Sequence, residues 1–249
     1  MNQTDIINGL YDLGVQAGMT LEVHSSLSSF GYVDGGADTV IEALIAAVGD
    51  KGAIVMPSFT ISALLPLTDE DRKLNIAEKS RILDEDDLKT DNGLGIIANT
   101  FRDRADTLTG KGMFRVSAWG KDAGLHTAAG FGRIIEHGGY ALLLGVDIYR
   151  LSSMHYMEDA MPDEVKQKFT ASDEARVKYP ENEWIIGSLI PVHKPWYKIQ
   201  DAAYQAGLIQ DGMIGNAKCM LFKVQPVVEL YRKALLEYPL EFYGLEHPL

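Results

Sequence analysis

The stretch LEVHSSLSSFGYVDGGADTVIEALIAAVGDKGAIVMP, residues 21–57, decides the fold class of this chain. Residues 21–24 form a short apolar run that reads as a strand. From 36 to 48, apolar residues recur at helical spacing, and the Gly-Asp-Lys-Gly segment 49–52 ends that helix. Residues 53–56 form a second apolar strand. This order predicts a βαβ unit, and the short apolar strands indicate burial on both faces of the sheet.

The rest of the chain continues this alternation. The pattern predicts further strands at 140–146 and 217–224, and helices at 95–102, 131–137, 152–160, 200–206 and 227–237. Residues 66–92 carry nine acidic and five basic side chains, which is typical of a surface excursion. Residues 165–195 hold aromatic and β-branched runs broken by prolines and read as an antiparallel addition. No linker marks a boundary, so we expect a single domain over 1–249.

Composition excludes several classes of protein. The 249 residues include 23 Lys and Arg against 35 Asp and Glu, a formal net charge of −12. This charge argues against nucleic-acid binding and suits a cationic partner or substrate. The only cysteine, Cys219, has no partner for an internal disulfide. The start, MNQTDIINGL, does not read as a signal peptide, and no apolar run is long enough for a membrane span. We therefore expect a cytoplasmic protein with no membrane association.

A Ser- and Gly-rich segment follows the first predicted strand and opens the predicted helix. It runs from His24 to Gly36, and serine hydroxyls with backbone N–H groups at a helix start can bind an anion such as a cofactor phosphate. The segment matches neither the dinucleotide-binding fingerprint nor a Walker loop, so the pattern names no ligand. An ordinary strand–turn–helix connection with serine caps explains the same residues equally well.

His155 and Glu158 are spaced so that both lie on one face of a predicted helix. Ser152 and Ser153 offer an N-cap for that helix, which would place His155 in its first turn. Glu158 can then hold one imidazole nitrogen and leave the other free as a base, and the helix dipole keeps the ring neutral. A surface ion pair without function is the alternative interpretation.

The remaining histidines and the cysteine point less clearly to a function. His24 stands at a strand end beside the serines and could help to line a site. The other histidines have no carboxylate or cysteine at ligand spacing, which argues against a zinc site; they are His126, His137, His193 and His247. Cys219 lies in an apolar run and reads as a small buried residue. No G-x-S-x-G elbow is present, which disfavours a serine hydrolase.

Five segments in order resemble the aminoglycoside 3-N-acetyltransferase family. They are HSSLSSFGYVDGGADTVIEAL (24–44), GAIVMPSFT (52–60), RVSAWGKDA (115–123), LLLGV with SSMHYME (142–158) and GMIGNAKCMLF (212–222). The resemblance covers nearly the whole chain. It implies a three-layer α/β/α sandwich around a mostly parallel or mixed sheet, with an insertion near 60–92 and the antiparallel addition near 165–195.

The resemblance also implies roles for individual residues. It makes His155 the general base and Glu158 the carboxylate that orients it. The cosubstrate is acetyl-CoA, and no metal is expected. The resemblance and the position of His24 give the expected cosubstrate-binding residues: His24, Ser25, Ser26, Leu27, Ser28, Val33, Gly35, Gly36 and Ser117.

The implied reaction is direct acetyl transfer to the 3-amino group of a 2-deoxystreptamine aminoglycoside, the basis of antibiotic resistance in this family. We expect acidic residues from 69–91 and from 158–164 to face this cationic acceptor. The sequence leaves homo-oligomerisation open and gives no sign of a nucleic-acid or membrane partner.

One departure from the family pattern concerns residues 111–115. Family members usually carry His-Pro there, whereas this chain reads Lys-Gly-Met-Phe-Arg. The change could suit another amine, and a CoA-binding protein without turnover is a further alternative. The last alternative is a metal-dependent hydrolase that uses His155, Glu158 and His24. The residues support this alternative least.

Overall fold

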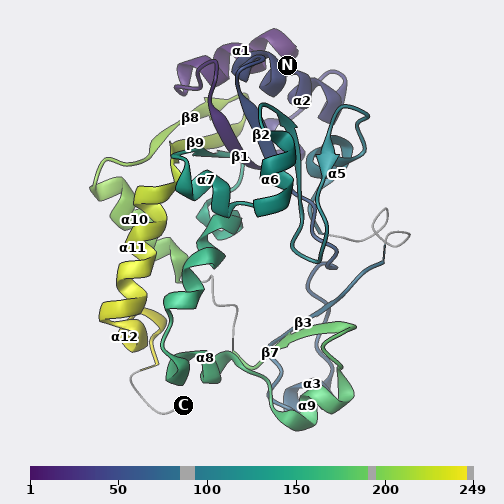
Figure 1. The fold of residues 1–249 in the computed structure, drawn as a ribbon, viewed down its shortest axis with the longest axis vertical. Helices are drawn as coiled ribbons and strands as arrows, with labels where there is room; N and C mark the ends of the chain where they lie inside the picture. Colours follow the sequence, from purple (N-terminus) through teal and green to yellow (C-terminus); the bar gives the residue numbers. More distant parts are fainter. Residues whose placement is uncertain (85–92, 190–194, 246–249) are drawn as a thin grey trace.

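The computed structural model describes residues 1–84, 93–189 and 195–245 (Figure 1). At its centre lies a seven-stranded sheet with the order β4-β5-β2-β1-β6-β9-β8. Its strands are β1 (Thr20–Ser25), β2 (Ala53–Pro57), β4 (Leu108–Thr109), β5 (Val116–Gly120), β6 (Tyr140–Leu144), β8 (Gln210–Ile214) and β9 (Ala217–Lys223). β1 pairs in parallel with β2 and β6, and the remaining pairs are antiparallel. The sheet is therefore mixed.

The predicted βαβ unit is confirmed. β1 and β2 are parallel, with Leu21 opposite Ile54, and the helix between them, α2, spans Gly36–Val48. β6 lies on the other side of β1, with Leu21 opposite Tyr140. Because β1, β2 and β6 run in the same direction, their carboxyl ends meet at one edge of the sheet, where α/β proteins commonly bind ligands.

Helices cover both faces of the sheet, which confirms the three-layer α/β/α prediction. One face packs against α1 (Gln3–Asp12), α2 and α5 (Ile96–Arg102). The other packs against α7 (Gly132–Glu136), α8 (Asp163–Phe169), α10 (Trp196–Gln205), α11 (Val224–Glu237) and α12 (Pro239–Tyr243). Three 3-10 helices, η1 (Leu27–Phe30), η2 (Ile148–Arg150) and η3 (Ser152–Ala160), and α6 (Ala123–Ala129) complete these layers.

The strands alternate between these layers, as their period of two requires. Leu142 and Leu144 of β6 pack with α1 and α2, whereas Ala141 and Leu143 pack on the opposite side. Each face thus has its own apolar core, and the sheet is buried between them. This rigid centre fixes the strand ends from which the candidate site is built.

A small lobe lies apart from the main sheet (Figure 1). We define it as α3 (Asp69–Lys73), β3 (Glu78–Arg81), α9 (Asp173–Lys178) and β7 (Trp184–Gly187). β3 and β7 pair antiparallel, with Ser80 opposite Ile185. The predicted insertion and the predicted antiparallel addition therefore pair with each other, and they share a separate apolar cluster centred on Ala175.

A buried ion pair holds the small lobe together. Nζ of Lys79 lies 2.6 Å from Oδ2 of Asp71, and the Tyr179 hydroxyl donates to the other carboxylate oxygen. Both charged side chains are buried. Hydrogen bonds from Lys79 and Tyr179 outweigh burial and hold the pKa of Asp71 well below its usual range. The carboxylate thus stays ionised and joins α3, β3 and α9.

Within the three described ranges, no helix combines the length and apolar character that crossing a membrane requires.

Candidate functional site

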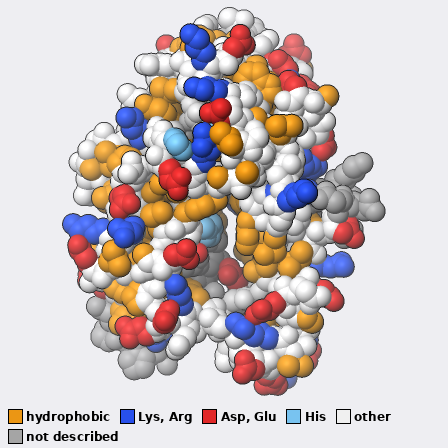
Figure 2. All heavy atoms as spheres, viewed as in Figure 1, with side chains coloured by type: hydrophobic (Ala, Val, Ile, Leu, Met, Phe, Trp, Pro, Cys, Tyr) orange, Lys and Arg blue, Asp and Glu red, His pale blue; other side chains and the backbone are white. Residues whose placement is uncertain are grey.

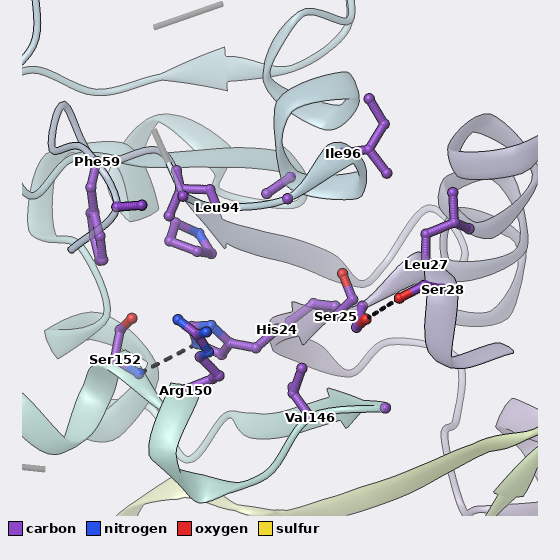
Figure 3. Close-up of a pocket in the computed structure, with 18 of the residues that line it drawn as sticks. His24, Ser25, Leu27, Ser28, Phe59, Leu94, Ile96, Val146, Arg150 and Ser152 are labelled. Carbon is purple, nitrogen blue, oxygen red and sulfur yellow. Dashed lines mark hydrogen bonds between the residues drawn. The ribbon is translucent and has the colours of Figure 1, made fainter. Parts of the chain in front are cut away.

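A cavity of about 1090 Å³ opens at the carboxyl ends of β1, β2 and β6. Side chains from several parts of the chain converge on it: His24 and Ser25 from the end of β1, Leu27 and Ser28 from η1, Val146, Arg150 and Ser152 after β6, and Phe59, Leu94 and Ile96 from the opposite wall (Figure 3). Serine hydroxyls and one arginine supply polar groups on an otherwise mainly apolar wall. The cavity can therefore hold an extended ligand with both apolar and polar parts.

The Ser-rich segment turns sharply out of β1. The backbone N–H of Ser26 donates to the carbonyl of Leu144 at 2.9 Å, which ties the turn to β6. The Oγ atoms of Ser26 and Ser28 lie 3.1 Å apart, and both residues line the cavity. Figure 3 labels Ser28. Ser29 points the other way and donates from Oγ to the carbonyl of Gly145 at 2.9 Å. These bonds fix the turn with two of its hydroxyls available to a ligand.

Six of the expected cosubstrate-binding residues line this cavity: His24, Ser25, Ser26, Leu27, Ser28 and Val33. The other three do not. Gly35 and Gly36 form the left-handed start of α2, beyond the lining. Ser117 is fully buried on β5, and its Oγ lies 2.8 Å from Oγ1 of Thr109.

His155 and Glu158 form the expected pair. Nδ1 of His155 lies 2.8 Å from Oε1 of Glu158, and the imidazole is about half exposed and lines the cavity. The imidazole packs edge-on against the ring of Trp196, with centroids 4.8 Å apart. An ionised carboxylate accepts from an Nδ1–H, so Nε2 of the neutral ring keeps its lone pair. The pair can therefore accept a proton at Nε2.

The helix that carries this pair differs from the predicted one. Residues 152–160 form the 3-10 helix η3 rather than an α-helix, so side chains three apart stand directly above one another. The predicted N-cap is also wrong. Leu151 is the cap residue, and Ser152 and Ser153 lie buried inside the helix. The spacing of three suits either helix type, which is why the pair was predictable although the helix type was not.

A buried carboxylate below the cavity was missed by the sequence analysis. Oε1 of Glu22 lies 2.9 Å from Nε2 of His24 and accepts the Ser153 backbone N–H at 3.0 Å. Glu22 is fully buried and His24 nearly so. The Ser152 nitrogen also approaches Nε2 of His24, at the longer distance of 3.4 Å (Figure 3). Glu22 therefore joins β1 to the start of η3; an acid inside an apolar strand is the signal that could have found it.

Glu78 brings a second carboxylate towards the imidazole. It belongs to β3 of the small lobe. Burial raises its pKa above the usual value, the Glu158 charge adds to the rise, and His155 opposes it. Two titratable groups from a separate part of the chain thus influence the charge of Glu78, and one of them, His155, lines the cavity. Figure 2 shows a hollow between the small lobe and the helices opposite it.

Other predicted acidic residues do not share one location. The Asp71 carboxylate is bound by Lys79, Asp69 pairs with Arg72, and Glu70 pairs with Lys178. The acidic residues at 85–87 and 91 lie outside the described residues, as do His193 and His247. Among the described acidic residues of 69–91, Glu78 is one whose carboxyl is affected by the charge of His155.

Cys219 and residues 111–115 lie away from the cavity lining. The Cys219 thiol is buried, as expected, and burial raises its pKa to about 11. The 111–115 segment packs behind the wall: the N–H of Ser58 donates to the carbonyl of Arg115, and the ring of Phe114 contacts that of Phe59 edge-on at 5.7 Å. Among the described residues, no group of three or more His, Cys, Asp or Glu side chains could hold a metal ion.

Comparison with known proteins places this fold among the antibiotic N-acetyltransferases, a class of acyltransferases. The model of the aminoglycoside 3-N-acetyltransferase family matches residues 23–236. The chain therefore belongs to the aminoglycoside 3-N-acetyltransferase family, which confirms the resemblance carried by its motifs.

Two curated relatives match most of the chain. It is 28% identical over 247 residues to the SPbeta prophage-derived aminoglycoside N(3′)-acetyltransferase-like protein YokD of Bacillus subtilis (strain 168), covering 92% of this chain and 90% of YokD. It is 26% identical over 257 residues to aminoglycoside N(3)-acetyltransferase III of Serratia marcescens, covering 92% of this chain and 95% of the relative.

Solved structures share the fold. The crystal structure of YokD from Bacillus subtilis superimposes with a TM-score of 0.73 at 26% identity, covering 96% of this chain and 94% of YokD. The structure of AAC-IIIb as a binary complex with CoASH gives a TM-score of 0.66 at 17% identity, covering 100% of this chain and 99% of AAC-IIIb. At 17% identity the second likeness establishes the fold alone.

Proposed function

We propose that this chain is an acetyl-CoA-dependent N-acetyltransferase that modifies the 3-amino group of 2-deoxystreptamine aminoglycosides, with residues 1–249 acting as one catalytic unit. The observation that carries the proposal is the 2.8 Å contact between His155 and Glu158 on the wall of the cavity. Family membership and the names of the relatives support the reaction. The CoASH bound to AAC-IIIb, which has the same fold, supports the choice of cosubstrate.

The cavity suits acetyl-CoA in its chemistry. An apolar wall that includes Leu27 and Leu94 can contact a pantetheine chain, and Ser26 and Ser28 can bond its amides. Arg150 is a cation in the same lining and can pair with a phosphate. Bound acetyl-CoA supplies the activated acetyl thioester.

In the proposed mechanism, His155 acts as the general base. As the acceptor amine attacks, its nitrogen forms the new bond to the acetyl carbon, and its proton passes to Nε2 of His155. The carbon–sulfur bond then breaks, and the thiolate leaves and takes up a proton. Glu158 holds the ring in the tautomer that has its lone pair on Nε2 and stabilises the imidazolium that forms. This route needs no acyl-enzyme, consistent with the burial of Cys219.

Glu158 and Glu78 also bring negative charge close enough to His155 to interact with it, although neither lines the cavity. An aminoglycoside carries several ammonium groups, so two carboxylates beside the base favour its binding.

A thiol-release assay tests the proposal directly. Purified protein is mixed with acetyl-CoA and a panel of aminoglycosides, beside His155→Ala and Glu237→Gln, the latter changing an exposed acid at the end of α11. We expect CoA release only with an aminoglycoside, a rate lower by about 10²–10⁴-fold in His155→Ala, and near-normal rates in Glu237→Gln. Wild-type rates in His155→Ala would refute the assignment of His155 as the general base.

A different amine is the second candidate acceptor, and one observation favours it. The 111–115 segment supports Phe59 in the cavity wall, through the contact with Phe114. Because this segment departs from the family pattern, the second candidate is an enzyme whose cavity wall accepts another amino sugar. If the aminoglycoside panel gives no turnover while CoA still binds, a panel of amino sugars and other metabolite amines separates this candidate from a CoA-binding protein without turnover.

A further inference from the structure

A second, smaller cavity lies at the opposite end of the sheet from the candidate site. Its volume is about 220 Å³, and it is formed where β1 and β6 begin and β5 ends. Its lining includes Thr20 of β1, Gly139 before β6 and Lys121 directly after β5. The sheet itself therefore separates this cavity from the carboxyl ends of β1 and β6.

The lining of this cavity is basic although the chain as a whole is acidic. Five side chains can carry positive charge and one carries negative charge: Lys51, Lys121, His126, Arg133 and His137 against Asp122. The chain has a net charge of −12, so a local excess of cations runs against its composition. Repulsion between these groups disfavours their grouping unless an anion offsets it.

Two of the cations have no carboxylate partner. Neither Lys51 nor Lys121 has an acidic oxygen within salt-bridge distance in the described part of the chain, and both are exposed at the mouth of the cavity. Arg133 is only partly neutralised: it donates to Asp122 at 3.3 Å and approaches Nε2 of His137 at 3.2 Å. The guanidinium is thus held in place by its neighbours.

The third observation is a buried histidine with no partner. His126 is 4% exposed and lines the cavity, and its Nδ1 is buried without a hydrogen-bond partner among the described residues. Leaving a buried polar atom unpaired is unfavourable, and such atoms commonly mark a ligand or water position. Burial, Arg133 and His137 all lower the pKa of this imidazole, so a nearby anion would reverse the effect of those charges.

We propose that this cavity is a binding site for a small phosphate-type oxyanion, held by Lys51, Lys121 and Arg133 with His126 at its base. A guanidinium presents paired N–H donors that match phosphate oxygens, and lysines supply mobile point charges. The volume suits a phosphate group or a small molecule that bears one. The site is distinct from the acetyl-CoA cavity, which lies across the sheet, and it does not depend on the proposed acetyl transfer.

Binding is tested by isothermal titration calorimetry with inorganic phosphate and, in a second arm, glycerol 3-phosphate, both at fixed ionic strength. The matched variants are Lys51→Gln with Lys121→Gln, Lys73→Gln as an exposed lysine of the small lobe, and Arg150→Gln in the larger cavity. We expect saturable binding of either ligand, weakened about tenfold or more in the double variant and unchanged in the other two. Tighter binding of the ester would indicate that a phosphorylated small molecule is the ligand.

A second readout reports on the site itself. The imidazole resonances of His126, assigned through His126→Gln, should shift on addition of phosphate in the wild type and stay in place in the double variant. The resonance shift in the wild type does not depend on the stability of any variant. Absence of saturable binding by both ligands, binding retained in the double variant, or loss of binding in Arg150→Gln would each overturn the proposal.

Discussion

The charge of His155 on η3 acts on the carboxyl of Glu78 on β3 of the small lobe and opposes the rise of its pKa. The two residues are far apart in the sequence, and β3 pairs with β7 rather than with the main sheet. The small lobe therefore contributes charge to a site whose remaining residues come from the strand ends. Under the proposed function, this relationship predicts that the small lobe takes part in acceptor binding.

Replacing Glu78 should weaken acceptor binding more than turnover. In Glu78→Gln we expect KM for a polycationic aminoglycoside to rise about tenfold, with kcat within about threefold, because one charge attraction is lost. Steady-state kinetics with Glu237→Gln as the matched control checks this. An unchanged KM would show that Glu78 does not face the acceptor.

The same residue predicts a pH dependence. The pKa of Glu78 is raised, so its negative charge disappears at a higher pH than that of an ordinary glutamate. KM of the wild type should therefore rise as the pH falls from 7 towards 5, and this rise should be smaller in Glu78→Gln, which has no carboxylate to protonate. Parallel KM profiles of the two proteins would contradict it.

The buried Asp71–Lys79 pair should control the stability of the small lobe. Asp71→Asn leaves the Lys79 ammonium buried without its counter-charge, and we expect a loss of about 3–5 kcal/mol in the free energy of unfolding. Asp69→Asn is the control, because that exposed carboxylate pairs with Arg72 at the surface and should change stability by less than about 1 kcal/mol. Urea denaturation at pH 7 measures both.

The carboxylate of Asp71 also predicts how the stability of the protein falls at low pH. The folded pKa of Asp71 is lowered, so its contribution is present above the unfolded value of 3.8 and is lost as the pH falls towards the lower folded pKa. Wild-type stability should therefore drop below about pH 4, and Asp71→Asn should lack this part of the drop. An identical acid limb in the two proteins would argue against the ionised pair.

Much of the fold was predictable because it is encoded locally. The apolar run at 21–24, the helical spacing of 36–48 and the run at 53–56 each carry their own period, and β1, α2 and β2 appear where these patterns predict them. The pairing of β3 with β7 was not predictable. The β3 sequence, Glu-Lys-Ser-Arg, lacks an apolar alternation, and its partner is remote in the chain.

The candidate site likewise has residues that the sequence could predict and residues that it could not. His155 and Glu158 could be found because three residues separate them, whereas Glu22 contacts Ser153 across 131 positions of the sequence. The resemblance predicts that Ser117 lies beside the cosubstrate, and this stays a prediction. In the structure Ser117 is buried on β5 and is not part of the cavity lining. Local spacing thus predicts pairs, and three-dimensional packing decides which of them share a surface.

Cys219 should be inert in the folded protein. Its pKa of about 11 leaves only about one thiolate in a thousand at pH 8, and the side chain is buried. Iodoacetamide at pH 8 should therefore neither label the native protein within the time of an activity assay nor reduce its activity, while labelling in 6 M guanidinium is complete. Mass spectrometry counts the label; rapid native labelling would show that the thiol is accessible.

Glu22 should matter for the position of η3 as well as for stability. Glu22→Ala leaves His24 and the Ser153 N–H without their buried acceptor, so we expect a loss of about 2–3 kcal/mol together with reduced kcat. Glu22→Gln keeps an amide oxygen at the same place and should recover most of the stability. Thermal unfolding and acetyl-transfer rates are measured side by side. Full activity in Glu22→Ala would remove this carboxylate from the support of the site.

Gly145 and Gly138 offer a matched pair in which backbone strain can be separated from steric contact. Both have positive φ, 69° and 70°, which side chains rarely adopt. A Cβ at Gly145 would lie 2.3 Å from Cβ of Ser29, whereas at Gly138 it would meet nothing within 4 Å. Gly138→Ala should therefore cost about 1–2 kcal/mol from backbone conformation alone.

Gly145→Ala should cost that amount and more, because its new methyl group forces the η1 turn away from the loop after β6. Moving this turn displaces Ser26 and Ser28, which face the cavity, so CoA binding should weaken about tenfold or more in Gly145→Ala and stay near the wild-type value in Gly138→Ala. Thermal unfolding measures the first effect and calorimetry with CoA the second. Equal CoA affinities in the two variants would show that the close approach of Gly145 and Ser29 is not what shapes the serine turn.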